Sequence, residues 1–262
     1  MNASTSDTIL IDEREGVRVI TLHRPEKLNA FNIELLTAFR QAIVQAAADD
    51  TVHVTVVTGA GRAFSVGADL AEMAQSHDEM IDGPRPGKQL FEDLQATLET
   101  FPKPLIGTIN GLGVGFGFTF LGYCDFALLA KSARLRTPFS QLALSPEASS
   151  SYLFPLRMGW RAAARALMLG DWFSAEEVVA CGLAQEVVED ADLMDAALAL
   201  AHRLAQAPLQ SLIATKALML EAHLPAMRAA RILEGKTIAG LIGTPANRAA
   251  VQAFAATRKS GN

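Results

Sequence analysis

Two glycine-containing stretches decide the fold: they read GRAFSVGADL at residues 61–70 and NGLGVGFGFT at residues 110–119. Each follows a predicted strand and precedes a predicted helix, so each indicates a tight turn where the helix begins. Backbone N–H groups at such a turn point outward and bind anions well. Taken singly, each stretch is also explained by an ordinary strand-to-helix connection, with Asp69 as an acidic residue in the first helical turn.

The segments on either side of these turns alternate between strand and helix patterns, and the chain then becomes helical. This order indicates an α/β core followed by a helical C-terminal part. The many small apolar residues of the C-terminal part fit either ordinary packing or association between subunits. The expected elements are a hairpin of residues 8–12 and 17–22, a helix over 32–48 capped by Asn32, strands over 52–58, 104–109, 125–130 and 133–137, and helices from Ser145 onward.

The overall composition excludes several classes of protein. The 262 residues are 50% hydrophobic and carry a formal net charge of −5, which argues against a nucleic-acid-binding surface. The two cysteines, Cys124 and Cys181, are too few for a disulfide framework or a zinc site, and the five histidines show no metal-ligand spacing. We therefore expect no metal. The N-terminus has no signal-peptide pattern, so we expect a cytoplasmic protein.

One stretch imitates a membrane-spanning helix. Residues 104–124 contain no charged side chain and are long enough to cross a bilayer. Six glycines and the turn dipeptide Asn110-Gly111 interrupt the stretch. A strand, a turn and a buried helix therefore explain it better than a membrane span does.

The second glycine stretch also invites comparison with a dinucleotide-binding loop. A G-x-G-x-x-G pattern that starts at Gly113 needs glycine where this chain has Phe118. No acidic residue follows at the distance where such a loop needs a ribose ligand. We therefore do not expect an NAD-dependent enzyme.

Two outward-facing N–H groups from separate loops are what an oxyanion hole requires. The oxygen of a thioester gains negative charge when its α-proton leaves, and fixed N–H dipoles in a dry site stabilise that enolate. The two glycine stretches together therefore favour proton transfer beside a thioester carbonyl.

Such chemistry also needs a base, and Glu147 is the candidate. In the sequence Ser145-Pro146-Glu147, serine resembles a helix cap and proline the first helical residue, which places Glu147 in the first turn. A glutamate there is also explained by its favourable interaction with the helix dipole. Its apolar and hydroxylic neighbours would raise its pKa if the carboxyl group were buried.

Longer segments resemble the crotonase (enoyl-CoA hydratase/isomerase) superfamily in the order that this superfamily shows. These segments are TLHRPEKLNAFN at residues 21–32, the stretch 61–70, and residues 103–125. The resemblance implies a crotonase-like α/β spiral of ββα units in residues 1–195. It further implies a helical region in residues 196–262 that mediates trimer formation, often as a dimer of trimers, and completes part of the CoA site.

The resemblance also assigns roles to individual residues. The backbone N–H groups of Ala68 and Phe116 would form the oxyanion hole. The coenzyme A part of the substrate would lie along two segments of the core and reach two C-terminal positions across a subunit boundary. These residues are Lys27, Leu28, Ala30, Gly67, Ala68, Asp69, Leu70, Phe254 and Lys259.

The departures from the family pattern bear on the reaction. Hydratases of this family use two glutamates, and the matching positions here are Thr119 and Phe139, neither of which can replace an acid–base pair. The stretch that includes Glu147 and the sequence SSSY at 149–152 instead resembles peroxisomal-type Δ3,Δ2-enoyl-CoA isomerases. Their single catalytic glutamate matches Glu147, whereas related chromodomain-type proteins lack it.

The sequence therefore predicts a Δ3,Δ2-enoyl-CoA isomerase of fatty acid β-oxidation. Glu147 would move a proton from C2 to C4 of the acyl-CoA, and no cofactor besides the coenzyme A of the substrate would be needed. The alternatives are a hydratase or another acyl-CoA reaction on the same fold, and a non-catalytic acyl-CoA-binding protein.

Overall fold

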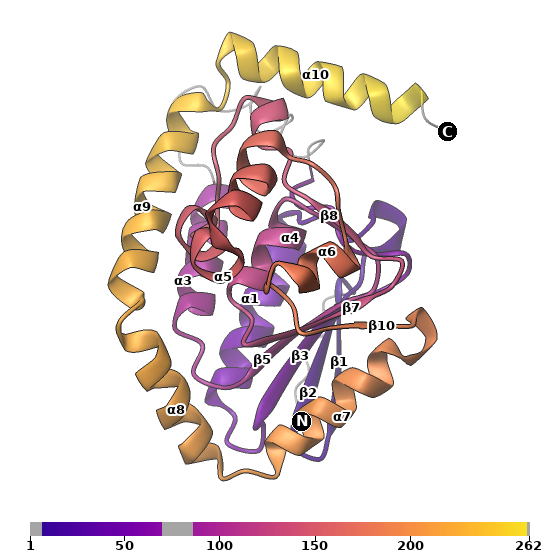
Figure 1. Ribbon diagram of the computed structural model, residues 1–262, viewed down its shortest axis with the longest axis vertical. Helices are drawn as coiled ribbons and strands as arrows, with labels where there is room; N and C mark the ends of the chain where they lie inside the picture. The colour runs from indigo at the N-terminus through magenta and orange to yellow at the C-terminus, as the bar shows by residue number, and fades with distance from the viewer. Residues whose placement is uncertain (1–6, 70–85, 261–262) are drawn as a thin grey trace.

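The computed structural model describes the backbone of residues 7–69 and 86–260, and the side chains of residues 7–69 and 87–254 (Figure 1). Within these ranges the chain forms two sheets, and helices pack around them (Figure 1). The predicted α/β core with a helical C-terminal part is confirmed.

The larger sheet has six strands in the order β1-β2-β3-β5-β7-β10. The first two strands pair antiparallel as the predicted hairpin, and all the others pair parallel. Strands β3 and β5 are buried along their whole length, as parallel strands covered on both faces are. The bounds are β1 (Ile9–Arg14), β2 (Val17–Leu22), β3 (Val54–Gly59), β5 (Leu105–Ile109), β7 (Phe126–Ala130) and β10 (Glu186–Val188).

The smaller sheet has the order β4-β6-β8-β9, where only the last pair is antiparallel. Each of β3, β5 and β7 is followed along the chain by a strand of this smaller sheet. The chain therefore winds from one sheet to the other as a spiral, which confirms the expected architecture. The bounds are β4 (Ala63–Ser65), β6 (Leu112–Val114), β8 (Arg134–Arg136) and β9 (Phe173–Ser174).

The sequence patterns missed four short strands, of which β4 lies in the first glycine stretch. Residues 112–114 were expected within a turn, but they form β6 because their backbone pairs with both β4 and β8. Strands β9 and β10 lie in the part expected to be helical, and β10 completes the edge of the larger sheet beside β7. Their two or three residues are too few to show a periodic pattern.

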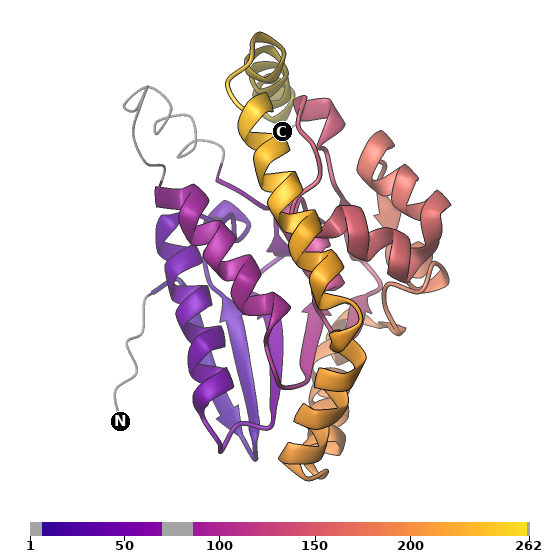
Figure 2. The same ribbon diagram turned by 90° about the vertical axis from the view of Figure 1, so that its left-hand side faces the viewer.

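Helices cover both faces of the larger sheet. Figure 2 shows α1 (Ile33–Ala48) and α3 (Pro86–Glu99) side by side on one face. On the other face α7 (Leu193–Ala205) packs on β2, β3, β5 and β7, and its Ala197 and Ala201 are fully buried. The division predicted after residue 195 thus falls inside a helix that packs on the sheet.

The remaining C-terminal helices run around the core (Figure 1). Helix α9 (Leu224–Leu241) packs on α3 and on α5 (Ser150–Ala164), and so reaches the residues around Glu147. The two other helices are α8 (Leu209–Glu221) and α10 (Pro245–Ser260), and the short internal ones are α4 (Phe116–Thr119) and α6 (Ala175–Ala180). Four short 3₁₀ helices are η1 (Pro25–Lys27), η2 (Phe120–Gly122), η3 (Ser140–Leu142) and η5 (Asp190–Asp192), and η4 (Arg165–Leu169) is a short π-helix.

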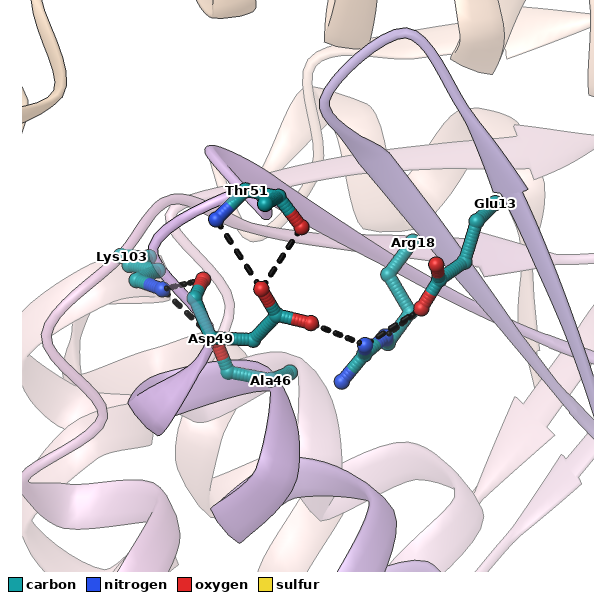
Figure 3. A network of polar contacts seen from close by, with 6 residues as sticks. All are labelled: Glu13, Arg18, Ala46, Asp49, Thr51 and Lys103. Atoms are coloured by element: carbon teal, nitrogen blue, oxygen red, sulfur yellow. Dashed lines mark hydrogen bonds and ion pairs between the residues drawn. The ribbon is translucent and has the colours of Figure 1, made fainter. Parts of the chain in front are cut away.

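A buried lysine holds the end of α1 against the sheet. The Nζ atom of Lys103 donates to the carbonyl oxygens of Ala46, at 2.8 Å, and of Asp49, at 2.7 Å (Figure 3). The Asp49 carboxylate accepts from Arg18 of β2 at 2.8 Å, and Arg18 also pairs with Glu13 of β1 (Figure 3). These contacts satisfy carbonyl groups that the end of a helix leaves without partners, and they fix α1 beside the first hairpin.

The uncharged stretch of residues 104–124 folds into β5, α4 and η2, as the predicted strand and buried helix require, and the expected turn between them also contains β6. Among the helices in the described ranges, none has the length and apolarity needed to cross a membrane.

Candidate active site

The two glycine loops meet in space. Gly67 has a φ of +78°, and a Cβ atom on it would lie 2.8 Å from the Val114 carbonyl oxygen and 3.5 Å from the Phe116 nitrogen. Such an approach leaves no room for a side chain, and the left-handed conformation also favours glycine. The loop that ends β4 and the turn that begins α4 are therefore in direct contact.

The backbone around Ala68 leaves its N–H group available. The Phe31 nitrogen donates to the Gly67 oxygen at 2.7 Å, and the Asp69 nitrogen donates to the Phe31 oxygen at 2.9 Å. Backbone groups alternate in direction along an extended segment, so the N–H of Ala68 points away from Phe31. Phe116 is the first residue of α4 and has no acceptor within its helix. Within the described residues, no hydrogen-bond acceptor is present for either N–H group.

The ring of Phe116 anchors its N–H group. This buried ring contacts Phe31 at 5.2 Å and Phe91 at 5.0 Å between centroids, both edge to face. Phe31 therefore holds both loops, one through its backbone and the other through its ring. No sequence pattern indicates a role for Phe91, and the one signal for Phe31 is its place in the family-like stretch of residues 21–32.

Glu147 faces the same junction. Its Oε1 atom lies 3.8 Å from the position that a Cβ atom of Gly115 would take, and Gly115 lies next to Phe116. The same Cβ position is 4.0 Å from the Cα atom of Gly67. The structure thus places the carboxyl group close to the two loops that contain Ala68 and Phe116.

The local conformation of Glu147 differs from the expected one. Helix α5 begins at Ser150, so Glu147 lies before the helix and not in its first turn. The expected cap, Ser145, has a buried hydroxyl group without a hydrogen-bond partner among the described residues. Ala148 and Ser149 have φ values of +61° and +54°, and this left-handed turn separates Glu147 from α5. Neither residue is one that sequence patterns associate with positive φ.

The surroundings of Glu147 change its proton affinity. Protein atoms surround the carboxyl group, although the residue keeps part of its surface accessible. Burial, and then the negative charge of Glu234, raise the pKa of Glu147 from 4.5 to about 7. A carboxyl group with such a pKa can both take and return a proton near neutral pH.

The predicted coenzyme A segments lie beside this junction. The Val66 nitrogen donates to the Leu28 oxygen at 3.1 Å, which joins the segment of Lys27, Leu28 and Ala30 to the loop of Gly67. Lys27 is exposed, Leu28 is half-buried and Ala30 is buried. An ion pair between Arg24 and Asp69, at 3.3 Å, ties the same two segments together.

Of the three other predicted contacts, two have side chains outside the described part of the structure and the third lies on α10. Leu70 lies outside the described residues, as does the side chain of Lys259. Phe254 is half-buried on α10, and α10 packs on η3, where Asn247 Nδ2 donates to the Leu142 oxygen at 2.7 Å. The contribution of α10 to the coenzyme A site stays a prediction.

The positions that match the hydratase glutamates are both buried. Thr119 is fully buried, with no hydrogen-bond partner for its hydroxyl group among the described residues, and Phe139 is 5% exposed. In the described ranges no group of three or more His, Cys, Asp or Glu side chains is placed to hold a metal ion.

The fold and this junction together define a class: an α/β spiral in which two loop N–H groups and one carboxyl group converge. The family model described as enoyl-CoA hydratase/isomerase matches residues 12–261. The chain belongs to this family, the crotonase superfamily, whose members act on acyl-CoA thioesters.

Several known proteins are similar to the chain. Enoyl-CoA delta isomerase 2 of Rattus norvegicus is 39% identical over 185 residues, or 71% of this chain and 47% of that protein. The chain thus spans about half the length of this relative. An enoyl-CoA hydratase/isomerase from Pseudoalteromonas atlantica has a TM-score of 0.88 at 28% identity, covering 95% of this chain and 97% of the other.

A third similar protein carries the name of the other reaction. Enoyl-CoA hydratase EchA8_6 from Mycobacterium marinum has a TM-score of 0.75 at 46% identity, covering 82% of this chain and 99% of the other. Because relatives are named for both reactions, the choice between isomerase and hydratase depends on the residues of the site.

Proposed function

We propose that the chain is a Δ3,Δ2-enoyl-CoA isomerase that acts on unsaturated fatty acyl-CoA. The observation that carries the proposal is the position of the Glu147 carboxyl group, which faces Gly115 where the loops of Ala68 and Phe116 meet. The relative named enoyl-CoA delta isomerase supports the same reaction.

The reaction needs one base and one oxyanion site. Glu147 takes a proton from C2 of the 3-enoyl-CoA, and the electron pair of that C–H bond moves towards the thioester. The resulting dienolate places negative charge on the thioester oxygen, which the N–H groups of Ala68 and Phe116 stabilise. The same carboxyl group then gives the proton to C4, and the double bond comes to lie between C2 and C3.

The residues present argue against hydration as the main reaction. Addition of water needs a group that orients the water and a group that relays its proton. Thr119 and Phe139, at the positions of the hydratase glutamates, are buried and provide no carboxyl group. Glu147 has a pKa of about 7 and is suited to exchange one proton with the substrate.

The substrate brings the coenzyme A, and the proposed steps need no other cofactor. Lys27, Leu28 and Ala30 would bind it together with Gly67, Ala68 and Asp69, because the backbone contacts place these two segments side by side. The reaction fits fatty acid β-oxidation, since it converts 3-enoyl esters into 2-enoyl esters that a hydratase can use.

The proposed enzyme is a homotrimer or a dimer of trimers. Large apolar side chains on the C-terminal helices are exposed, such as Leu218 at 78% and Leu233 at 66%, and a neighbouring subunit would cover them. In such an assembly Phe254 and Lys259 would reach the coenzyme A across the boundary. The cytoplasmic location stays a prediction.

A pair of substrates separates the candidate functions. Incubation with 3-hexenoyl-CoA is expected to give trans-2-hexenoyl-CoA, whereas crotonyl-CoA is expected to gain little water. Faster hydration of crotonyl-CoA than isomerisation of 3-hexenoyl-CoA would contradict the proposal. Tight binding of both esters without turnover would instead support a non-catalytic acyl-CoA-binding protein.

A further inference from the structure

A buried glutamate from the C-terminal helical part holds the turn that follows Glu147. Glu234 lies on α9 and is 6% exposed. Its Oε2 atom accepts from the Ser149 nitrogen at 2.7 Å, and its Oε1 atom accepts from the Ser151 nitrogen at 2.8 Å. One carboxylate thus binds two N–H groups at the start of α5.

The turn needs such a partner. Ala148 and Ser149 are both in the left-handed conformation, which costs non-glycine residues on the order of 1–2 kcal/mol each and persists only where contacts enforce it. Ser149 does not cap α5 with its own side chain. Glu234 supplies the cap from α9, and so satisfies N–H groups that the start of a helix leaves free.

We propose that Glu234 is a positioning residue for Glu147. By fixing the Ala148–Ser149 turn, it aims the Glu147 carboxyl group at the junction of the two glycine loops, and its charge keeps that carboxyl group ready to hold a proton. The proposal rests on the proposed function for its kinetic consequences, whereas its structural and electrostatic consequences can be measured without turnover.

The other charged groups near this turn form a pair. Glu99 of α3 is 1% exposed, accepts from the Ser149 hydroxyl group at 3.0 Å and forms an ion pair with Arg231 of α9 at 3.0 Å. The Tyr123 hydroxyl group donates to that of Ser149 at 3.4 Å, and burial holds the pKa of Tyr123 well above its usual range. Burial, and to a smaller extent the charge of Glu99, raise the pKa of Glu234, whereas the N–H groups of Ser149 and Ser151 lower it. After burial, the charge of Glu234 is what raises the pKa of Glu147.

Two substitutions separate charge from position. Glu234→Gln removes the charge, and its amide nitrogen cannot accept a hydrogen bond from the second N–H group. Glu234→Asp keeps the charge but is one methylene group too short to reach both N–H groups. Glu92→Gln is the matched control, because Glu92 lies on α3 near α9 and pairs with Lys88 at the surface, at 3.6 Å.

The kinetic test compares kcat, KM and the pH profile for isomerisation of 3-hexenoyl-CoA. In Glu234→Gln we expect kcat to fall on the order of tenfold or more, with KM near the wild-type value. The acid limb of its profile should move to lower pH, because the ionised form of Glu147 is no longer opposed by a neighbouring charge. Glu234→Asp should lower kcat and leave the acid limb in place, and the control should change neither.

A purely structural role would lower stability without moving the acid limb. A folded Glu234→Gln protein with the wild-type acid limb, or with the wild-type kcat, overturns the proposal. If this variant does not fold, Glu234→Asp decides the question, and a wild-type kcat in that variant also overturns it.

A measurement without turnover keeps the two proposals distinct. In protein with ¹³C-labelled glutamate side chains, the Glu147 signal is assigned by its absence in Glu147→Gln. It should titrate near pH 7 in the wild type and at lower pH in Glu234→Gln. Absence of isomerase activity would refute the proposed function alone, whereas an unchanged titration would refute the role of Glu234.

Discussion

The ring of Phe31 packs edge to face against the ring of Phe116, with centroids 5.2 Å apart and planes at 70°. The backbone of Phe31 also bonds to Gly67 and Asp69, on either side of Ala68. One residue of the N-terminal segment therefore sets the distance between the two N–H groups proposed to bind the thioester oxygen.

Replacing Phe31 with leucine tests this link. Phe31→Leu keeps the backbone bonds and most of the volume but loses the edge-to-face contact, so we expect a stability loss of about 1 kcal/mol. Because Phe116 loses its anchor, kcat for 3-hexenoyl-CoA should fall about tenfold. Phe173→Leu is the control: it alters a buried pair with Phe118, 5.7 Å between centroids, and should lower stability without lowering kcat. Equal kcat values in the two variants would show that Phe31 has no special role.

Gly67→Ala tests the contact between the loops. A Cβ atom there would meet the Val114 carbonyl oxygen at 2.8 Å in a left-handed conformation, so we expect a stability loss of about 1–3 kcal/mol and loss of most activity. Gly240→Ala on α9 is the matched control, because nothing lies within 4 Å of its Cβ position. It should leave activity unchanged and raise stability by up to about 1 kcal/mol. Thermal unfolding and isomerase assays on both variants check this, and a fully active Gly67→Ala protein would refute the close contact.

The raised pKa of Glu147 predicts a pH dependence of stability. The folded protein binds this proton more tightly than the unfolded chain, so the stabilising contribution is complete below pH 4.5 and is lost as the pH rises through about 7. Glu147→Gln, which needs no proton, should therefore gain stability relative to the wild type between pH 5 and pH 8, by about 1–3 kcal/mol. Urea unfolding of both proteins at the two pH values measures the change. A difference that does not vary with pH would place the Glu147 pKa near its ordinary value.

The sequence was informative where a pattern extends over many residues. The helix capped by Asn32 follows from apolar periodicity, and its Asn32 side chain does accept from the Leu35 nitrogen at 2.9 Å. The hairpin and the long parallel strands follow from β-rich runs that turn residues separate. The two glycine turns are predicted as a pair that supplies outward N–H groups, but their contact at Gly67 and Gly115 is seen only in the structure.

The sequence was silent where distant segments decide the conformation. The start of α5 at Ser150, and not at Pro146, depends on a carboxylate about 85 residues further along the chain, since Glu234 caps the N–H groups there. The contact of Phe91 with Phe116 and the pairing of β10 with β7 likewise arise only after folding. No local pattern reports such contacts.

The most direct test is the turnover of 3-hexenoyl-CoA by Glu147→Gln, beside Glu186→Gln, an exposed glutamate on β10, as control. Because glutamine cannot take the C2 proton, kcat should fall on the order of 10²–10⁴-fold, while calorimetry shows unchanged binding of a saturated acyl-CoA. Glu186→Gln should match the wild type. Wild-type turnover by a folded Glu147→Gln protein would contradict the proposal that this carboxyl group is the base.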